Sequence, residues 1–346
     1  MIVLPNLGAE EGLEPSALPP ALDDAVRVFA WLFGKDVRIL DWKGEIAWPE
    51  ALGPAPGGPL LSELEGDAFA WLATAEAQER LRAAGGHPRL PPPSVVRAVH
   101  DKAFAQRAAL QSGRLPDCLR GLIEVLEPDE IDPAVVEAKV RSLPPWVGRD
   151  WMLKPRWGSS GRGRVRRLQD VRGSTDRLRR LGGAVFEPWL RRVEDLSALL
   201  LLLPDGGVRW IGTTRQILRA AGVYLGSRGL VDAEGRLVSG SPWDDEMRAA
   251  AEEVARRVAA LGYFGPIGVD GFVFLGPDGE EVLRPVVETN ARFTMGIAAV
   301  GLLMHALRQG VVTAPAEWVF SLDGQARGAT RTLPLGDRAL LGWRRC

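Results

Sequence analysis

The sequence predicts an α/β fold in which a Rossmann-like βαβ domain at the N-terminus precedes a larger α+β region. Near the start, the apolar run IVLP, an apolar-periodic segment over 22–32 and the run VRIL over 37–40 follow the order strand, helix, strand. This order is typical of a parallel sheet. Farther along, the runs GVDGFVFL and EEVLRPVVETN flank the turn GPDG, which indicates an antiparallel hairpin. Parallel and antiparallel strands are therefore expected in different parts of the chain.

The composition argues against several classes of protein. Hydrophobic residues make up 46% of the 346 residues and charged residues 25%, as in an ordinary globular protein, and the net charge of -1 gives no general attraction to nucleic acid. Two cysteines are too few for a disulfide scaffold. The first residues lack the basic start and long apolar centre of a secretory signal, and the most apolar stretch, 196–203, is far shorter than the roughly 20 residues of a membrane span. We expect a cytoplasmic protein that binds neither membranes nor nucleic acid.

Proline and glycine divide the chain into three expected parts. The stretch ALGPAPGGPLL and the later LPPPS interrupt the N-terminal region and place its boundary near Pro93. We expect an N-terminal domain over 1–97, a central part over 98–184 and a C-terminal part over 185–346.

Capping signals predict the helices of the second and third parts. Asp101 is a suitable cap for a helix that runs through Leu110, and Asp132 with Pro133 starts another. A cap at Ser241 predicts a long helix over 244–260. Shorter or more apolar helices are expected over 174–181 and 294–308, and strands are expected at WMLKP, AVFEPWL, LSALLLLL and VRWIGTTRQIL.

A lysine followed by a glycine-rich loop is the first candidate site. Lys154 lies in the strand WMLKP, and the loop WGSSGRGRV follows it. Glycines let backbone N–H groups approach a polyphosphate, and the lysine adds a positive charge. Only five of the 43 basic residues are lysines, so a lysine retained here indicates a chemical requirement. A solvated hairpin is the alternative. The loop residues expected to bind phosphate are Gly158, Ser159, Ser160, Gly161 and Gly163.

The connector after AVFEPWL is the second candidate site. It begins at Glu187, and its extended backbone at Pro188 and Leu190 offers a carbonyl and an N–H group to the edge of an adenine. The carboxylate of Glu194 can accept hydrogen bonds from ribose hydroxyls. An ordinary strand connection is the alternative interpretation.

Asp270, Glu288 and Asn290 form the third candidate site. Glu288 and Asn290 are two apart in one strand, so they share a face, and a facing Asp270 would complete an all-oxygen site for Mg²⁺, with Mn²⁺ as an alternative. A tight hairpin turn would place Asp270 opposite Pro285 and leave Glu288 on the other face. The prediction therefore requires a bulge or a wider loop, and Pro285 within the strand independently indicates such a break. A surface acid with a capping asparagine is the alternative.

Taken together, these segments resemble the ATP-grasp superfamily of carboxylate-amine ligases and carboxylases, which includes D-alanine ligase and biotin carboxylase. The resemblance covers 99–295 and lies in the order of the motifs as well as their content. Residues 1–97 would be the variable N-terminal domain, 98–184 the lid subdomain and 185–346 the subdomain with the metal site. The matching segments are Asp101-Lys102, Lys154 with GSSGRG, the hinge residues Glu187, Leu190 and Glu194, and GVD…ETNAR, which includes Arg292.

The resemblance implies an enzyme that uses ATP and Mg²⁺ to join a carboxylate to an amine through an acyl phosphate, with release of ADP and phosphate. It implies that Lys102 and Lys154 bind phosphates and that Arg292 stabilises charge on the transferred group. The expected substrates are small-molecule or peptide carboxylates and amines, and a homodimer is left open. Arg215 and Tyr224 are candidates for the acceptor pocket, with salt bridging or packing as the alternative role.

Other functions stay open from the sequence. A kinase or a non-catalytic ATP-binding sensor would use the same motifs. The arginines between 156 and 180 indicate a nucleic-acid-binding module, but this segment has no interleaved aromatic residue beyond Trp157 and belongs to a nearly neutral protein, so a solvated lid face fits better. The three scattered histidines match neither a hydrolase triad nor a zinc site.

Overall fold

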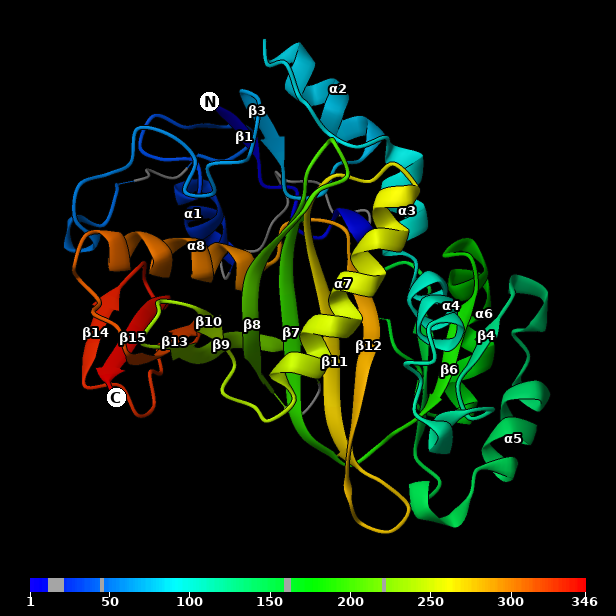
Figure 1. Ribbon diagram of the computed structural model, residues 1–346. Helices are drawn as coiled ribbons and strands as arrows, with labels where there is room; N and C mark the ends of the chain where they lie inside the picture. The colour runs from blue at the N-terminus through cyan, green and yellow to red at the C-terminus, as the bar shows by residue number, and fades with distance from the viewer. Residues whose placement is uncertain (12–21, 44–46, 159–162, 220–221) are drawn as a thin grey trace.

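The computed structural model describes residues 1–11, 22–43, 47–158, 163–219 and 222–346. These residues form two three-stranded sheets and one nine-stranded sheet (Figure 1). None of the helices in the described part of the chain is long and apolar enough to cross a bilayer.

The first small sheet belongs to the N-terminal domain. Its strands are parallel in the order β2-β1-β3, which confirms the predicted strand, helix, strand order. Helix α1 follows β1 and packs against α8 of the C-terminal part (Figure 1). The elements are β1 (Ile2–Leu4), α1 (Asp23–Trp31), β2 (Arg38–Ile39), β3 (Ala68–Ala70) and α2 (Ala75–Ala83).

The second small sheet, called here the lid sheet, is antiparallel in the order β4-β6-β5. The predicted caps are present, since the side chain of Asp101 accepts from the Ala103 N–H at 2.8 Å and that of Asp132 accepts from the Ala134 N–H at 2.7 Å. The elements are α3 (Pro93–His100), α4 (Lys102–Gln111), β4 (Glu124–Leu126), α5 (Pro133–Ser142), β5 (Trp151–Pro155), α6 (Leu168–Arg180) and β6 (Ala184–Pro188).

Helix α6 is longer than the predicted 174–181. It starts at Leu168, because the buried side chains of Val171 and Leu178 lie on one face and hold the earlier turns against the lid. Gly173 therefore lies inside the helix and does not mark its start.

The large sheet runs in the order β12-β11-β7-β8-β9-β13-β15-β14, with β10 paired to β9. The strands after β8 were not predicted, except for the hairpin of β11 and β12. In β9, glycines occupy positions where apolar side chains would have indicated a strand. A Cβ on Gly226 would lie 2.1 Å from the carbonyl oxygen of Phe320, so close strand pairing requires glycine there. The strands are β7 (Arg192–Leu202), β8 (Val208–Leu218), β9 (Tyr224–Val231), β10 (Leu237–Val238), β11 (Gly265–Leu275), β12 (Glu281–Asn290), β13 (Ala316–Ser321), β14 (Arg331–Pro334) and β15 (Leu340–Arg345).

Two helices cover opposite faces of this sheet (Figure 1). Helix α7 (Asp244–Ala260) has its predicted range, but its cap is Trp243 and not Ser241, whose hydroxyl instead donates to the carboxylate of Glu194. Helix α8 (Met295–Arg308) is capped by Thr294, which accepts from the Ile297 N–H at 3.2 Å.

One carboxylate joins the N-terminal helix α1 to the turn between β14 and β15. Asp24 accepts hydrogen bonds from the N–H groups of Asp337 (3.0 Å), Arg338 (2.7 Å) and Ala339 (2.8 Å). A Cβ on Gly336 would lie 2.0 Å from Asp24 Oδ1, so the close approach depends on glycine. Burial alone would raise the pKa of Asp24, but these donors and Arg27 lower it.

Replacing Asp24 with alanine is expected to lower the free energy of unfolding by about 2–3 kcal/mol, because three backbone donors lose a charged acceptor. Because the pKa of Asp24 is lowered on folding, its contribution is present above the unfolded pKa and is lost as the pH falls through the folded pKa. Urea unfolding followed by tryptophan fluorescence measures both effects. The control is Asp23→Ala in the same helical turn, since the Asp23 side chain accepts from the Trp42 indole at 3.4 Å and from no backbone N–H of the described residues. Equal losses in the two variants would contradict the assigned role of Asp24.

Candidate active site

A cavity of about 330 Å³ lies on the face of the large sheet that α8 covers. Leu7, Gly8 and Trp71 line it from the N-terminal domain, and Lys154 lines it from the lid sheet. The remaining walls come from β7, β8, β9, β11, β12 and the start of α8. The cavity therefore lies where all three parts of the chain meet, and it contains the predicted Lys154, Asp270, Glu288, Asn290 and Arg292.

The pairing of β11 with β12 brings the predicted metal ligands together. Asp270 lies directly opposite Glu288, and Phe272 lies opposite Arg284. Gly271 of β11 therefore faces the three residues 285–287 of β12, two more than in a regular ladder, and these residues form a bulge, one of the two breaks that the prediction allowed. The prediction of a break at Pro285 is confirmed.

Hydrogen bonds hold Asp270 at the centre of this group. Its Oδ1 accepts from Ser197 (2.7 Å) and Gln216 (2.8 Å), and its Oδ2 accepts from the amide of Asn290 (2.8 Å). Burial, followed by the negative charge of Glu288, raises the pKa of Asp270 to about 6 in spite of these donors. Two carboxylates thus face each other where water is scarce, and a cation between them would relieve the repulsion.

The donor set fits a hard divalent cation such as Mg²⁺, because it consists of two carboxylates and one amide oxygen. In the described part of the chain, no group of three or more His, Cys, Asp and Glu side chains is placed to hold a metal. Asp270, Glu288 and Asn290 would therefore supply part of the coordination of such a cation, and oxygens from outside the protein the rest.

Lys102 connects the metal ligands to the glycine loop. Its Nζ lies 3.0 Å from Glu288 Oε1 and donates to the carbonyl of Gly158 at 2.6 Å. Burial would raise the pKa of Glu288, but Lys102 and Lys154 lower it to about 2. At the other end of the loop, the carbonyl of Gly163 accepts from Arg177 at 2.8 Å. The predicted loop residues Ser159, Ser160 and Gly161 lie outside the described residues.

Lys154 belongs to a buried group of three charges. Its Nζ pairs with Glu187, and the other carboxylate oxygen of Glu187 lies 3.0 Å from Arg284 Nη1. Burial lowers the pKa of Lys154 to about 8, whereas the two cations hold the pKa of Glu187 far below its usual range despite burial. The side chain of Glu187 therefore orients Lys154, and the predicted contact of the connector with a nucleotide base stays a prediction for the backbone at Pro188 and Leu190.

The structure corrects the predictions for Glu194 and Arg215. Both lie on the face of the sheet opposite the cavity, where Glu194 Oε2 is 2.9 Å from Arg215 Nε. Arg215 also donates to the carbonyl of Gly240 at 2.7 Å. Successive side chains of a strand point to opposite faces, so Asp195, which follows Glu194 in β7, lines the cavity and Glu194 does not. Arg215 therefore has the alternative role given above, a salt bridge, and not a place in the acceptor pocket.

The sequence analysis did not predict two further cavity residues, Arg164 and Arg192, which line the cavity together with Lys154. Arg192 donates to Asp195 at 2.6 Å, and its guanidinium lies 4.1 Å from the ring of Phe272. Arginine is so abundant in this chain that neither residue stands out.

Tyr224 lines the cavity as predicted. Its hydroxyl and that of Ser227 form a 2.7 Å hydrogen bond in which either one can be the donor. The hydroxyl that accepts in this bond keeps its own proton for another partner.

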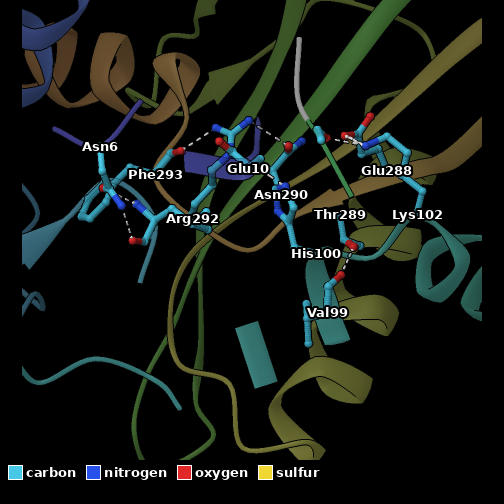
Figure 2. A network of polar contacts seen from close by, with 12 residues as sticks. Asn6, Glu10, Val99, His100, Lys102, Glu288, Thr289, Asn290, Arg292 and Phe293 are labelled. Atoms are coloured by element: carbon cyan, nitrogen blue, oxygen red, sulfur yellow. Dashed lines mark hydrogen bonds and ion pairs between the residues drawn. The ribbon is translucent and has the colours of Figure 1, made fainter. Parts of the chain in front are cut away.

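Arg292 joins the metal ligands to the N-terminal domain (Figure 2). Its Nε lies 2.6 Å from the buried carboxylate of Glu10, and its two terminal nitrogens donate to Phe293 O (2.8 Å) and Asn290 Oδ1 (3.3 Å). His100 lies 3.8 Å from the same Glu10 oxygen, and burial lowers the pKa of His100 to about 4, so the imidazole is neutral at pH 7. The N-terminal domain thus fixes the orientation of Arg292, a connection that no motif indicated.

No protein-family model and no curated protein sequence matches this chain. Solved structures match its fold. A biotin carboxylase from Campylobacter jejuni, described as a beta-gamma-ATP complex, has a TM-score of 0.55 and 14% identity, over 100% of this chain and 87% of that chain. An N5-carboxyaminoimidazole ribonucleotide synthetase from Thermus thermophilus has a TM-score of 0.53 and 15% identity, over 100% and 94% of the two chains.

A third match is the biotin carboxylase domain of the Hydrogenobacter thermophilus 2-oxoglutarate carboxylase, which was solved with MgADP, ADP and bicarbonate. It has a TM-score of 0.52 and 12% identity, over 99% of this chain and 86% of that chain. Identity at this level shows the fold alone, and the likeness extends over nearly the whole chain. Biotin carboxylase is one of the ATP-grasp enzymes, the superfamily that the motifs resemble. The chain therefore has the ATP-grasp fold.

Proposed function

We propose that the protein uses ATP to activate a carboxylate and transfers the acyl group to an amine, with release of ADP and phosphate. The observation that supports this function is the meeting of two kinds of charge in one cavity. Lys154, Arg164 and Arg192 supply positive charge for a polyphosphate, and the facing Asp270 and Glu288 suit the cation that accompanies it.

In this proposal the nucleotide lies between the lid sheet and the large sheet. Lys154 and Lys102 bind its phosphates, together with the glycine loop, and the backbone of Pro188 and Leu190 faces the base. Asp270, Glu288 and Asn290 would hold Mg²⁺, which supplies charge neutralisation at the polyphosphate.

The chemistry then consists of two substitutions. A carboxylate oxygen of the acid attacks the γ-phosphorus, the bond to the ADP oxygen breaks, and an acyl phosphate forms. The amine next attacks the acyl carbon, phosphate leaves, and the amine loses a proton. Arg292 orients the acid and stabilises negative charge on its oxygens, while the side chains from the N-terminal domain keep water from the acyl phosphate.

Replacing Lys154 with methionine is expected to reduce acid-dependent ADP release at least about 100-fold, because a fixed charge at the phosphates is lost. Circular dichroism should show an intact fold, since Glu187 keeps its partner Arg284. The exposed Lys35→Met serves as the matched control and should retain full activity. Unchanged turnover in the Lys154 variant would exclude the proposed role.

Hydroxylamine should replace the amine and trap the acyl group as a hydroxamate, which an iron(III) colour assay measures together with ADP. The expected result is one hydroxamate for each ADP. A kinase on the same scaffold would release ADP and form a stable phosphorylated product without hydroxamate. A non-catalytic sensor would bind the nucleotide and release no ADP with any acid.

Glu10→Gln is expected to lower kcat/KM for the acid by about 10–100-fold and to leave the KM for ATP nearly unchanged, because Arg292 loses the charge that orients it. Steady-state kinetics with each substrate varied separately measures this difference. Glu50→Gln, at an exposed position of the same domain, is the control. A purely structural role for Glu10 would change both KM values and the melting temperature together.

A further inference from the structure

A second groove, of about 220 Å³, lies on the large sheet at the end remote from the lid sheet (Figure 1). None of the described residues that line it also lines the cavity. Arg215 of β8 lies between the cavity residues Thr214 and Gln216. Arg228 of β9 follows the cavity residue Ser227. Because successive side chains of a strand alternate in face, both arginines point away from the cavity, and the groove opens on the opposite face of the sheet.

Arginine side chains dominate this groove, which is called here the arginine groove. Its charged lining residues are Arg215, Arg228, Arg327, Arg344 and Glu317. Arg344 binds both carboxylate oxygens of Glu317, from Nε at 2.9 Å and from Nη2 at 2.7 Å. Nε of Arg215 lies 2.9 Å from Oε2 of Glu194. These two ion pairs neutralise two of the guanidinium groups and leave two positive charges in excess.

The excess charges belong to Arg228 and Arg327. The side chain of Arg228 forms neither a hydrogen bond nor an ion pair with any described residue. Arg327 donates to the side chain of Gln325 at 3.1 Å and has no carboxylate partner in the described part of the chain. Arg228 also lies directly opposite Arg215 on the neighbouring strand, where like charges destabilise a sheet. An anion in the groove would offset this repulsion.

The groove holds further donors that the protein leaves unused. Ser239 lines it and is 3% exposed, and its hydroxyl accepts from the Ser241 N–H at 3.0 Å. A hydroxyl that accepts keeps its own proton, and this one donates to none of the described residues. Nη2 of Arg215 donates to the Gly240 carbonyl at 2.7 Å, which leaves its Nη1 for a ligand. The carboxylate of Glu317, by contrast, is already bound on both oxygens.

This arrangement favours a phosphate group over a carboxylate. The donors come from β8, from β9, from Ser239 after β10 and from Arg327 between β13 and β14, so they reach a ligand from several segments. A phosphate monoester presents three oxygens and carries a charge of about −1.5 to −2 at pH 7, which matches the two excess cations. A carboxylate presents two oxygens and one charge. The volume is below the about 300–1,000 Å³ of sites for drug-sized ligands, so the molecule is small.

We propose that the arginine groove is a second binding site, which takes free phosphate or the phosphate group of a small molecule. It lies apart from the candidate active site and does not depend on the proposed function.

Calorimetric titration with inorganic phosphate and with glycerol 3-phosphate, at constant ionic strength, tests this site. We expect saturable binding that is weakened at least about tenfold in the double variant Arg228→Met/Arg327→Met, because charge-assisted hydrogen bonds to the phosphate are lost. Arg331→Met, at an exposed position of β14 outside the groove, is the matched control and should bind as the unchanged protein does. The tighter of the two probes identifies the source of the phosphate group. Binding of neither probe would overturn the inference.

The cations of the cavity require a second control. Lys154→Met removes one of them and should leave binding at the arginine groove unchanged. Loss of binding in Lys154→Met, with binding retained in the double variant, would place the phosphate in the cavity and overturn the inference. Acetate that binds as tightly as phosphate, or binding that no variant alters, would show only a general attraction of anions and would overturn it as well.

Melting temperatures provide an independent measurement. Because Arg228 faces Arg215, its replacement by methionine should not lower the melting temperature of the ligand-free protein. Phosphate should raise the melting temperature of the unchanged protein, since a ligand that binds the folded state stabilises it, and should raise that of the double variant less. An equal increase in both proteins would contradict the assigned site.

Discussion

The register between β11 and β12 is the constraint on which the candidate site depends. Leu275 pairs with Glu281 beside the turn, so a regular ladder continued from there would set Asp270 opposite Val286 and leave Glu288 two residues farther along β12. Because the three residues 285–287 face Gly271 alone, the pairing shifts by two residues and sets Asp270 opposite Glu288. Gly271 makes the shift feasible, because a Cβ there would lie 2.8 Å from both Arg284 O and the sulfur of Met247. Pro285 contributes as well, since it cannot donate a ladder hydrogen bond.

The cations of the site are held by buried carboxylates. Lys102 pairs with Glu288, Lys154 with Glu187 and Arg292 with Glu10. Burying charges costs free energy that such pairs offset only in part, so they contribute little to net stability. They do fix the positions of the positive groups within the protein itself. Under the proposed function, such a preoriented cation would need no rearrangement during phosphoryl transfer, which is where electrostatic catalysis gains most.

Much of the fold and the centre of the site could be predicted from the sequence, because residues close together in the chain indicated each of these features. Asp101 and Asp132 marked helix starts, and Pro285 marked the bulge. The errors arose where the signal was not local. The run LSALLLLL is apolar except for Ser197, so it has too little alternation to show which face Glu194 or Asp195 takes. The contact of Glu10 with Arg292 joins positions far apart in the chain, and no periodicity reports such a contact.

The lining of the cavity explains why the sequence indicates a nucleotide and a cation but no particular substrate. Lys154, Asp270 and Glu288 are charged residues within recognisable motifs, and all three line the cavity. Leu7 and Trp71 line it as well, but in a sequence such apolar residues look like any core residues. Only the folded chain shows that they lie at the cavity, with the ring of Trp71 5.4 Å from the guanidinium of Arg292. Under the proposed function, residues of this kind would contact the acid, and their apolar chemistry carries no motif from which the acid could be named.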